Sequence, residues 1–193
     1  MVERLPASLL AALADLVSWL ESIHQPSMVI GGVAASALGR PRMTQDIDAL
    51  ALIPEASWQS SVTSAQQFGI TPRIPGVVDF AQRSRVLLLH HLASGIDIDV
   101  IIGGLQFERE ACGHSEIHDI GGLRVRLPRV EDLLVMKAVA RRPKDLQDIE
   151  GLLEAHPNLN LSLVRRWVSE FAAATAMPDM IEELEKILSR HAR

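Results

Sequence analysis

Two aspartates separated by one residue, Asp46 and Asp48, have the type and spacing best suited to chemistry in this sequence. They begin an apolar run typical of a β-strand, in which residues i and i+2 project from the same face. Thirteen residues separate Asp46 from the glycine pair Gly31-Gly32, which lies between an apolar run and a helix-prone segment. A helix start favours anions, and Mg²⁺ is usually held by one or two carboxylates plus substrate phosphates. Each feature alone is common, but together they predict a site for a metal-bound triphosphate.

A second pair of aspartates, Asp97 and Asp99, lies in the apolar run 96–102. Both project from one face of the expected strand, and a carboxylate without a partner is costly in such surroundings. Asp99 lies deeper in the run, so we assign it to the site and interpret Asp97 as a solvated edge residue. Which of the two is the third carboxylate stays open. The adjacent His90 and His91 would point to opposite faces of their strand and would make a poor metal chelate.

The surrounding pattern predicts the elements that position these carboxylates. We expect helices at 6–23, 33–38, 57–68, 130–140, 144–154, 162–174 and 180–190, strands at 28–30, 46–53, 85–91, 96–102, 116–120 and 123–127, and a connection at 71–76. A half that mixes strands and helices therefore precedes a half that is only helical. We predict an α/β (α+β) fold with a mixed sheet over residues 1–127 and a C-terminal helical bundle over residues 128–193, packed on it.

Composition and charge restrict the class of protein. The chain has 193 residues, 48% of them hydrophobic, as in an ordinary globular domain. No apolar run reaches the roughly 18 residues that span a bilayer, and a single cysteine cannot form an internal disulfide. We therefore expect a cytoplasmic protein with no membrane segment. The net charge of −5 argues against a general polyanion binder, although residues 124–144 carry seven basic and two acidic side chains that could meet phosphate.

The helical half contributes fewer candidates. Spacing on the helix 130–140 leaves Lys137 off the apolar face, where a lysine is usually solvated. Asp145 follows Pro143 at the start of the next helix, where a carboxylate opposes the helix dipole and capping explains it. Asp148 could instead pair with Lys137 or a nearby arginine and position it.

Two runs of the sequence resemble a known family. The run VIGGVAASALGRPRMTQDIDALAL resembles the signature of the DNA-polymerase-β-like nucleotidyltransferase superfamily, with Gly-Gly in place of the commoner Gly-Ser. The run EDLLVMKAVARRPKDLQDIEGLL is similar to a helix pair in AbiEii-type nucleotidyltransferases of abortive-infection and toxin–antitoxin systems. Together the two runs cover roughly residues 28–153, and the resemblance implies that residues 1–127 form the catalytic domain.

The resemblance also implies the roles of individual residues. Gly31 and Gly32 would approach the triphosphate, Asp46 and Asp48 would bridge two Mg²⁺ (or Mn²⁺) ions, and Asp99 would complete the catalytic carboxylates. Two metal ions would clamp the attacking and leaving oxygens of an in-line displacement, so that no covalent protein intermediate is needed.

The same resemblance supplies the remaining nucleotide-binding candidates. Arg42 and Thr44 would lie near phosphate, and Lys137 would reach into the site and offset charge on the departing pyrophosphate. Asp148, in the second run, joins this nucleotide-binding set.

The acceptor is the least determined part of the prediction. The first hypothesis is transfer of a nucleoside monophosphate from a nucleoside triphosphate to RNA, such as tRNA, which the basic stretch supports. The resemblance adds transfer to a protein, as a toxin with an antitoxin partner. The alternatives are transfer to a small molecule such as an antibiotic, and a non-catalytic nucleotide-binding module of the same fold.

Overall fold

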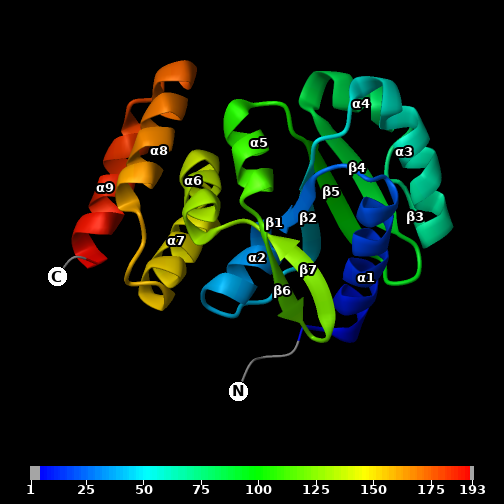
Figure 1. The fold of residues 1–193 in the computed structure, drawn as a ribbon, viewed down its shortest axis with the longest axis horizontal. Helices are drawn as coiled ribbons and strands as arrows, with labels where there is room; N and C mark the ends of the chain where they lie inside the picture. The colour runs from blue at the N-terminus through cyan, green and yellow to red at the C-terminus, as the bar shows by residue number, and fades with distance from the viewer. Residues whose placement is uncertain (1–4, 192–193) are drawn as a thin grey trace.

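The computed structural model describes residues 5–191 and is built around a five-stranded mixed sheet (Figure 1). Its strands are β1 (Ser27–Ile30), β2 (Asp46–Ala51), β3 (Ile70–Pro72), β4 (Val86–His91) and β5 (Ile96–Ile102). They lie in the order β1-β2-β5-β4-β3, with β2 and β5 parallel and the other neighbours antiparallel. β6 (Glu116–Ile120) and β7 (Leu123–Leu127) form a separate hairpin.

Helices surround the sheet and continue beyond it. They are α1 (Ala7–Ser22), α2 (Gly31–Leu38), α3 (Trp58–Ala65), α4 (Val77–Ser84), α5 (Gln106–Gly113), α6 (Val130–Ala140), α7 (Pro143–Ala155), α8 (Leu161–Thr175) and α9 (Asp179–His191), with short 3₁₀ turns at Glu55–Ser57 and Gln66–Phe68 flanking α3. Within residues 5–191, no helix is both long and apolar enough to cross a membrane.

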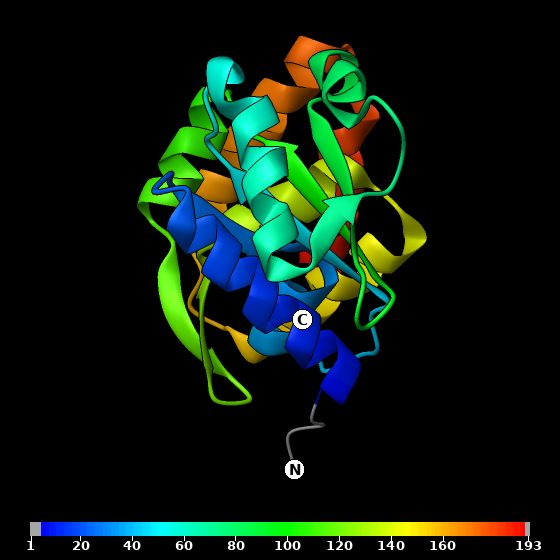
Figure 2. The same cartoon turned by 90° about the vertical axis from the view of Figure 1, so that its right-hand side faces the viewer.

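The two faces of the sheet have different surroundings. The fully buried side chains of β4 and β5, among them Leu89 and Ile98, lie on one face with His91. The ring of His91 contacts Asp15 of α1, and Trp19 of α1 donates to the Ser61 carbonyl of α3 over 3.1 Å. Helices α1 and α3 thus lie side by side over this face (Figure 2). The opposite face stays partly open, and the polar side chains of the strands lie there.

The C-terminal helices pack on the other side of the molecule. Helix α6 contacts α2, α7, α8 and α9, while α8 and α9 form one end of the molecule's longest axis (Figure 1). Helix α5 joins this group through Phe107, whose ring meets that of Trp167 edge to face at 5.3 Å. The helical half is therefore in contact with α2, the helix that begins at the glycine pair.

Most elements expected from the sequence are confirmed, including the mixed α/β class, the strands that carry the aspartates and the four C-terminal helices. The sequence analysis missed helices α4 and α5, which have eight residues each. The expected connection at 71–76 was wrong over its first two residues, which belong to β3. Such short elements give little periodicity, and the proline in β3 is tolerated because β3 is an edge strand.

Candidate functional site

The register of the sheet brings the four aspartates together on its open face. Asp48 lies opposite Asp99 and Asp46 lies opposite Asp97 in the parallel β2–β5 pair. In the antiparallel β4–β5 pair, His90 lies opposite Asp97. Residues directly opposite in neighbouring strands share a face, so these five side chains all emerge on the same side of the sheet.

The glycine pair at the start of α2 lies directly against this row. Gly31 has φ +63°, in the left-handed region, and a Cβ at this position would collide with the carboxylate of Asp48. A Cβ at Gly32 would lie 2.5 Å from Oγ1 of Thr44, which donates to Oδ1 of Asp46 over 2.9 Å. The glycines are therefore needed for Asp48 and Thr44 to lie at the helix start.

Arg73 and His90 hold the second pair of aspartates. Nη1 of Arg73 lies 2.8 Å from Oδ2 of Asp97, and Nη2 lies 2.8 Å from Oδ1 of Asp99. Nδ1 of His90 lies 2.8 Å from the other oxygen of Asp97. Both oxygens of Asp97 are thus engaged by protein groups, whereas Asp99 makes its ion pair through Oδ1.

The pKa values of these aspartates shift in opposite directions. Burial raises the pKa of Asp48, and repulsion from Asp46 and Asp99 adds to the shift, against attraction from Arg142 and Lys137. Burial also raises the pKa of Asp99, against attraction from Arg73. The His90 hydrogen bond, helped by Arg73, lowers the pKa of Asp97. Asp48 and Asp99 are therefore carboxylates whose charge the surrounding protein leaves incompletely balanced.

The carboxylates suit a divalent cation by their chemistry, because oxygen ligands and uncompensated negative charge are what Mg²⁺ requires. Within residues 5–191, no three His, Cys, Asp or Glu side chains already converge as a ready-made metal site. Asp46 is hydrogen-bonded to Thr44 and Asp99 is ion-paired with Arg73. A cation that bound Asp46, Asp48 and Asp99 would therefore have to replace part of these contacts.

Lys137 lies in a buried charge network rather than on an exposed helix face. Its Nζ lies 2.9 Å from Asp145 and 2.8 Å from Asp148, and its side chain is 3% exposed. Arg42 makes two hydrogen bonds to Asp148, over 2.6 and 2.8 Å, and Arg142 pairs with Asp145 over 2.7 Å. The expected solvent-facing position of Lys137 was wrong because other helices enclose α6 on several sides.

The three cations of the network stabilise the charged form of its two buried carboxylates. Burial alone would raise the pKa of Asp145 and of Asp148. Hydrogen bonds from Arg142 and Lys137 instead bring the pKa of Asp145 below its usual value. Hydrogen bonds from Arg42 and Lys137 do the same for Asp148. Lys137 and Asp148 are thus both buried, although Lys137 lies close enough to Asp48 to attract it. Asp148 has both oxygens engaged by cations, and Lys137 directs its ammonium to two carboxylates.

Most of the basic stretch predicted to meet phosphate is paired with carboxylates in the same way. Arg129 pairs with Asp132, and Arg141 pairs with Asp179 and Glu183. Together with Lys137 and Arg142, four of the seven basic residues of 124–144 are ion-paired. The local excess of positive charge seen in the sequence is therefore largely neutralised by the fold.

Arg142 is the member of the network that also reaches solvent. Its side chain is 50% exposed, and attraction from Asp48 and Asp46 contributes to raising its pKa, after the larger effect of its hydrogen bond to Asp145. It stands at the start of α7, where Asp145 also accepts from its backbone N–H over 3.1 Å. Arg142 is thus an accessible cation close to the aspartates.

Sequence reasoning did not assign Arg73, His90, Asp145 or Arg142 to the site. The signal for Arg142 was present, because a proline followed two residues later by aspartate is typical of a capped helix start. The signal for His90 was its position in a strand next to the turn that leads to Asp97. Arg73 had no local signal, since its place depends on the pairing of β3 with β4.

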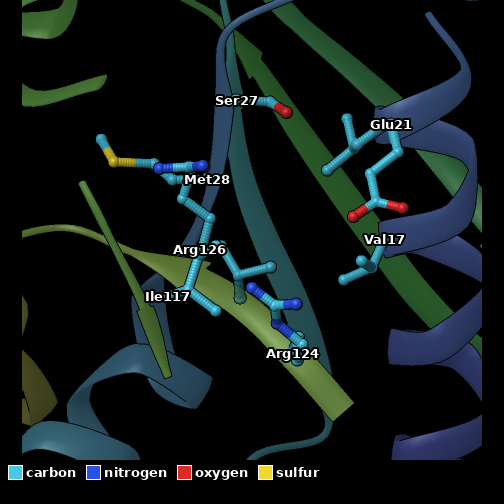
Figure 3. A pocket seen from close by; sticks show the side chains of 9 residues that line it. Val17, Glu21, Ser27, Met28, Ile117, Arg124 and Arg126 are labelled. Carbon is cyan, nitrogen blue, oxygen red and sulfur yellow. The ribbon is translucent and has the colours of Figure 1, made fainter. Parts of the chain in front are cut away.

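Three cavities within residues 5–191 lie away from the aspartates, one of them, of about 270 Å³, between α3 and the start of α4. Figure 3 shows one of about 250 Å³ between α1, β1 and the β6–β7 hairpin, where Glu21 and Arg124 face the same space. A larger one of about 900 Å³ lies beside α2, and Arg42 is the one predicted site residue that lines it. None of the three is lined by any of the four aspartates.

We expect Lys137→Ala to lower the free energy of unfolding by about 3–5 kcal/mol, because it leaves buried carboxylates without their shared cation. Chemical denaturation measures this loss. Lys144→Ala is the matched control, since it removes one positive charge from an exposed position of the same segment. Equal, small losses in the two variants would show that the ion pairs of Lys137 contribute little.

We expect Asp48→Asn to raise the melting temperature of chelator-treated protein at neutral pH by about 1–3 °C. A raised pKa means that folding disfavours the charged form of Asp48. This penalty is absent below the ordinary pKa of aspartate, about 4, and develops as pH rises through the raised value. The gain should therefore vanish near pH 3 in a thermal scan.

Asp97→Asn is the control with the opposite sign. Its lowered pKa means that folding favours the charged form, a stabilisation present at neutral pH and lost as pH falls through the lowered value. Asp97→Asn should thus destabilise at neutral pH, and shifts of the same sign in both variants would contradict the assignment.

The chain is similar to known proteins over most of its length. The sequence profile described as nucleotidyl transferase of unknown function (DUF2204) matches residues 90–190, slightly more than half of the chain. The comparison with curated proteins gave no match.

Among solved structures, the solution structure of the antibiotic-resistance factor ANT(2'')-Ia is 16% identical, covering 86% of this chain and 92% of its own, with a TM-score of 0.59. The same factor in complex with adenylyl-2''-tobramycin is 17% identical, covering 85% and 97%, with a TM-score of 0.56. The lincomycin-bound lincosamide antibiotic adenylyltransferase LnuA is 14% identical, covering 80% and 100%, with a TM-score of 0.54.

At these identities the structural likeness concerns the fold, whereas the profile match identifies the family. The two agree, since the mixed sheet and its flanking helices have the nucleotidyltransferase fold. The chain therefore belongs to the nucleotidyl transferase family DUF2204 and is a nucleotidyltransferase enzyme.

Proposed function

We propose that the protein transfers a nucleoside monophosphate from a nucleoside triphosphate to an acceptor hydroxyl, with a divalent metal held by Asp46, Asp48 and Asp99. The observation that carries this proposal is the parallel register of β2 and β5, which sets Asp48 opposite Asp99 beside the glycine start of α2. Bound Mg²⁺ or Mn²⁺ would supply charge neutralisation at the attacking and leaving oxygens. The chain's own residues have to position the triphosphate and the acceptor.

Asp99 rather than Asp97 is the third carboxylate in this proposal. Both oxygens of Asp97 are occupied by Arg73 and His90, and its pKa is lowered. Asp99 pairs through Oδ1 alone, its pKa is raised, and it lies directly across from Asp48. A metal ligand needs an oxygen that the protein can release, and Asp99 meets this requirement better.

The triphosphate occupies the side of the aspartates formed by α2 and α7. The backbone at Gly31 and Gly32 can come close to phosphate oxygens, and the exposed guanidinium of Arg142 lies where it would attract them. Lys137, Asp145 and Asp148 act as positioning residues, because they fix Arg142 and Arg42 through buried ion pairs. Residues 1–127 and 128–193 would then contribute to one site.

The acceptor in this proposal is a small hydroxyl-bearing molecule. Ion pairs take up four of the seven basic residues in 124–144, which reduces the positive charge available to a polyanion such as RNA. The nucleotidyltransferase fold accommodates lincomycin in LnuA and adenylyl-2''-tobramycin in ANT(2'')-Ia. The RNA or protein acceptor, and with it a toxin–antitoxin role, stays a prediction from the sequence that the same assay tests.

We expect Asp99→Asn and Asp46→Asn to lower nucleotidyl transfer at least about a hundredfold, because each removes charge that acts directly on the reacting groups. Asp97→Asn should retain activity within about tenfold of the wild type, as expected for a residue outside the reacting groups. Release of labelled pyrophosphate in a single-turnover assay measures both. The order is reversed if Asp97→Asn is the inactive variant, and Asp97 is then the third carboxylate.

The acceptor assay uses purified protein, Mg²⁺ and each triphosphate labelled in its α-phosphate. Three kinds of acceptor are added in separate reactions: aminoglycosides and lincosamides, total cellular RNA, and a protein lysate. We expect metal-dependent label in a small-molecule product that Asp46→Asn does not form. Label in RNA or protein would contradict the small acceptor, while absence of transfer and of triphosphate binding would contradict the enzymatic proposal itself.

A further inference from the structure

Arg73 reaches the two aspartates of β5 from the β3 edge of the sheet, across β4. It follows β3, and its backbone N–H donates to the carbonyl of Leu88 in β4 over 2.9 Å. Since Leu88 lies opposite Asp99, Arg73 extends the row that contains Asp99 and Asp48. One guanidinium nitrogen binds Asp97 and another binds Asp99, each over 2.8 Å.

These contacts give Arg73 two anchors of different kinds. Asp97 is bound from both sides, by Arg73 and by His90, and it serves no other contact in the proposed site. Asp99 is the carboxylate that the metal needs. A cation on the second oxygen of Asp99 would share one carboxylate with the guanidinium of Arg73 and repel it, so the two compete for Asp99, while Asp97 can keep the guanidinium close by.

We propose that Arg73 is an internal counter-ion of Asp99 that competes with the divalent metal, so that the metal binds tightly only when it arrives with the triphosphate. This inference rests on the proposed metal site at Asp46, Asp48 and Asp99. A free metal ion gains the carboxylates but must weaken or break the Arg73–Asp99 pair, because both cations draw on the charge of one carboxylate. A metal ion on a triphosphate brings phosphate contacts to α2 and Arg142 that offset this cost.

The competition makes metal and triphosphate binding mutually dependent. If the triphosphate increases metal affinity, the metal increases triphosphate affinity by the same factor. Removing Arg73 should weaken this coupling, because the free metal then meets an Asp99 without a competitor. The pair is partly exposed, with 29% exposure at Arg73 and 35% at Asp99, so the effect is expected to be moderate.

The test measures Mn²⁺ binding to the full chain by electron paramagnetic resonance, with and without a triphosphate analogue whose α,β-bridge cannot be cleaved. We expect Arg73→Ala to bind Mn²⁺ alone about three- to tenfold more tightly than wild type. In the presence of the analogue the affinities should differ by less than this factor. The strand pairing at Arg73 uses its backbone, which alanine retains, and circular dichroism confirms folding.

Two variants serve as controls. Arg83→Ala removes one exposed positive charge from nearby α4, and its Mn²⁺ affinity should stay within about twofold of wild type. Asp97→Asn removes the charge of one of the two carboxylates that pair with Arg73, so that Asp99 is its remaining charged partner. Mn²⁺ should therefore bind this variant no more tightly than it binds the wild type. A tightening with Arg73→Ala that Arg83→Ala does not reproduce distinguishes competition from a general change in charge, because both variants remove one positive charge.

The outcomes separate this inference from the proposed function. If wild type binds Mn²⁺ with the analogue but Arg73→Ala matches Arg83→Ala, the counter-ion role is overturned and the enzyme assignment stands. Equal tightening of Mn²⁺ binding with and without the analogue overturns the coupling. If neither wild type nor Arg73→Ala binds Mn²⁺ in any condition, the proposed metal site fails and the inference fails with it.

Discussion

Parallel pairing of β2 with β5 is the constraint on which the rest of the site depends. It sets Asp48 beside Asp99 and Asp46 beside Asp97 on a face that the helices leave partly open. Carboxylates so close repel one another, and burial increases the cost of their charge. The protein meets this cost with cations that approach from both sides, Arg73 from the strands and Arg142 from the helices. Both arginines thus lie where they attract the negative charge of the aspartates on β2 and β5.

The helical half contributes to the site through buried ion pairs. Asp145 and Asp148 are almost fully buried, yet their pKa values are lowered because Lys137 and two arginines surround them. A network of this kind is stable only when every member is satisfied, and within residues 5–191 no buried side-chain nitrogen or oxygen lacks a partner. It therefore holds Arg142 at a defined position near Asp48, which a solvated lysine at 137 could not do.

The local parts of this arrangement could be predicted from the sequence, whereas the non-local parts could not. The pairing of Asp46 with Asp48 in one site could be predicted because strand periodicity places both on the same face. The glycine pair lies in the same short run of sequence. Lys137 was misplaced because helical spacing gives the faces of α6 but not the helices that enclose it. The role of Arg73 depends on a three-residue edge strand with a proline, paired across β4 to β5. No pattern within a single segment contains that information.

The two sides of the aspartates differ in how firmly their cations are held. On the helical side, Lys137 is enclosed between two buried carboxylates, and breaking such pairs leaves an uncompensated buried charge. On the strand side, Arg73 pairs with half-exposed carboxylates, where solvent can replace a broken contact at small cost. The ion pairs on the strand side are therefore the ones that cost less to break. The protein thus combines a fixed framework next to α2 and α7 with an adjustable ion pair next to β3 and β4.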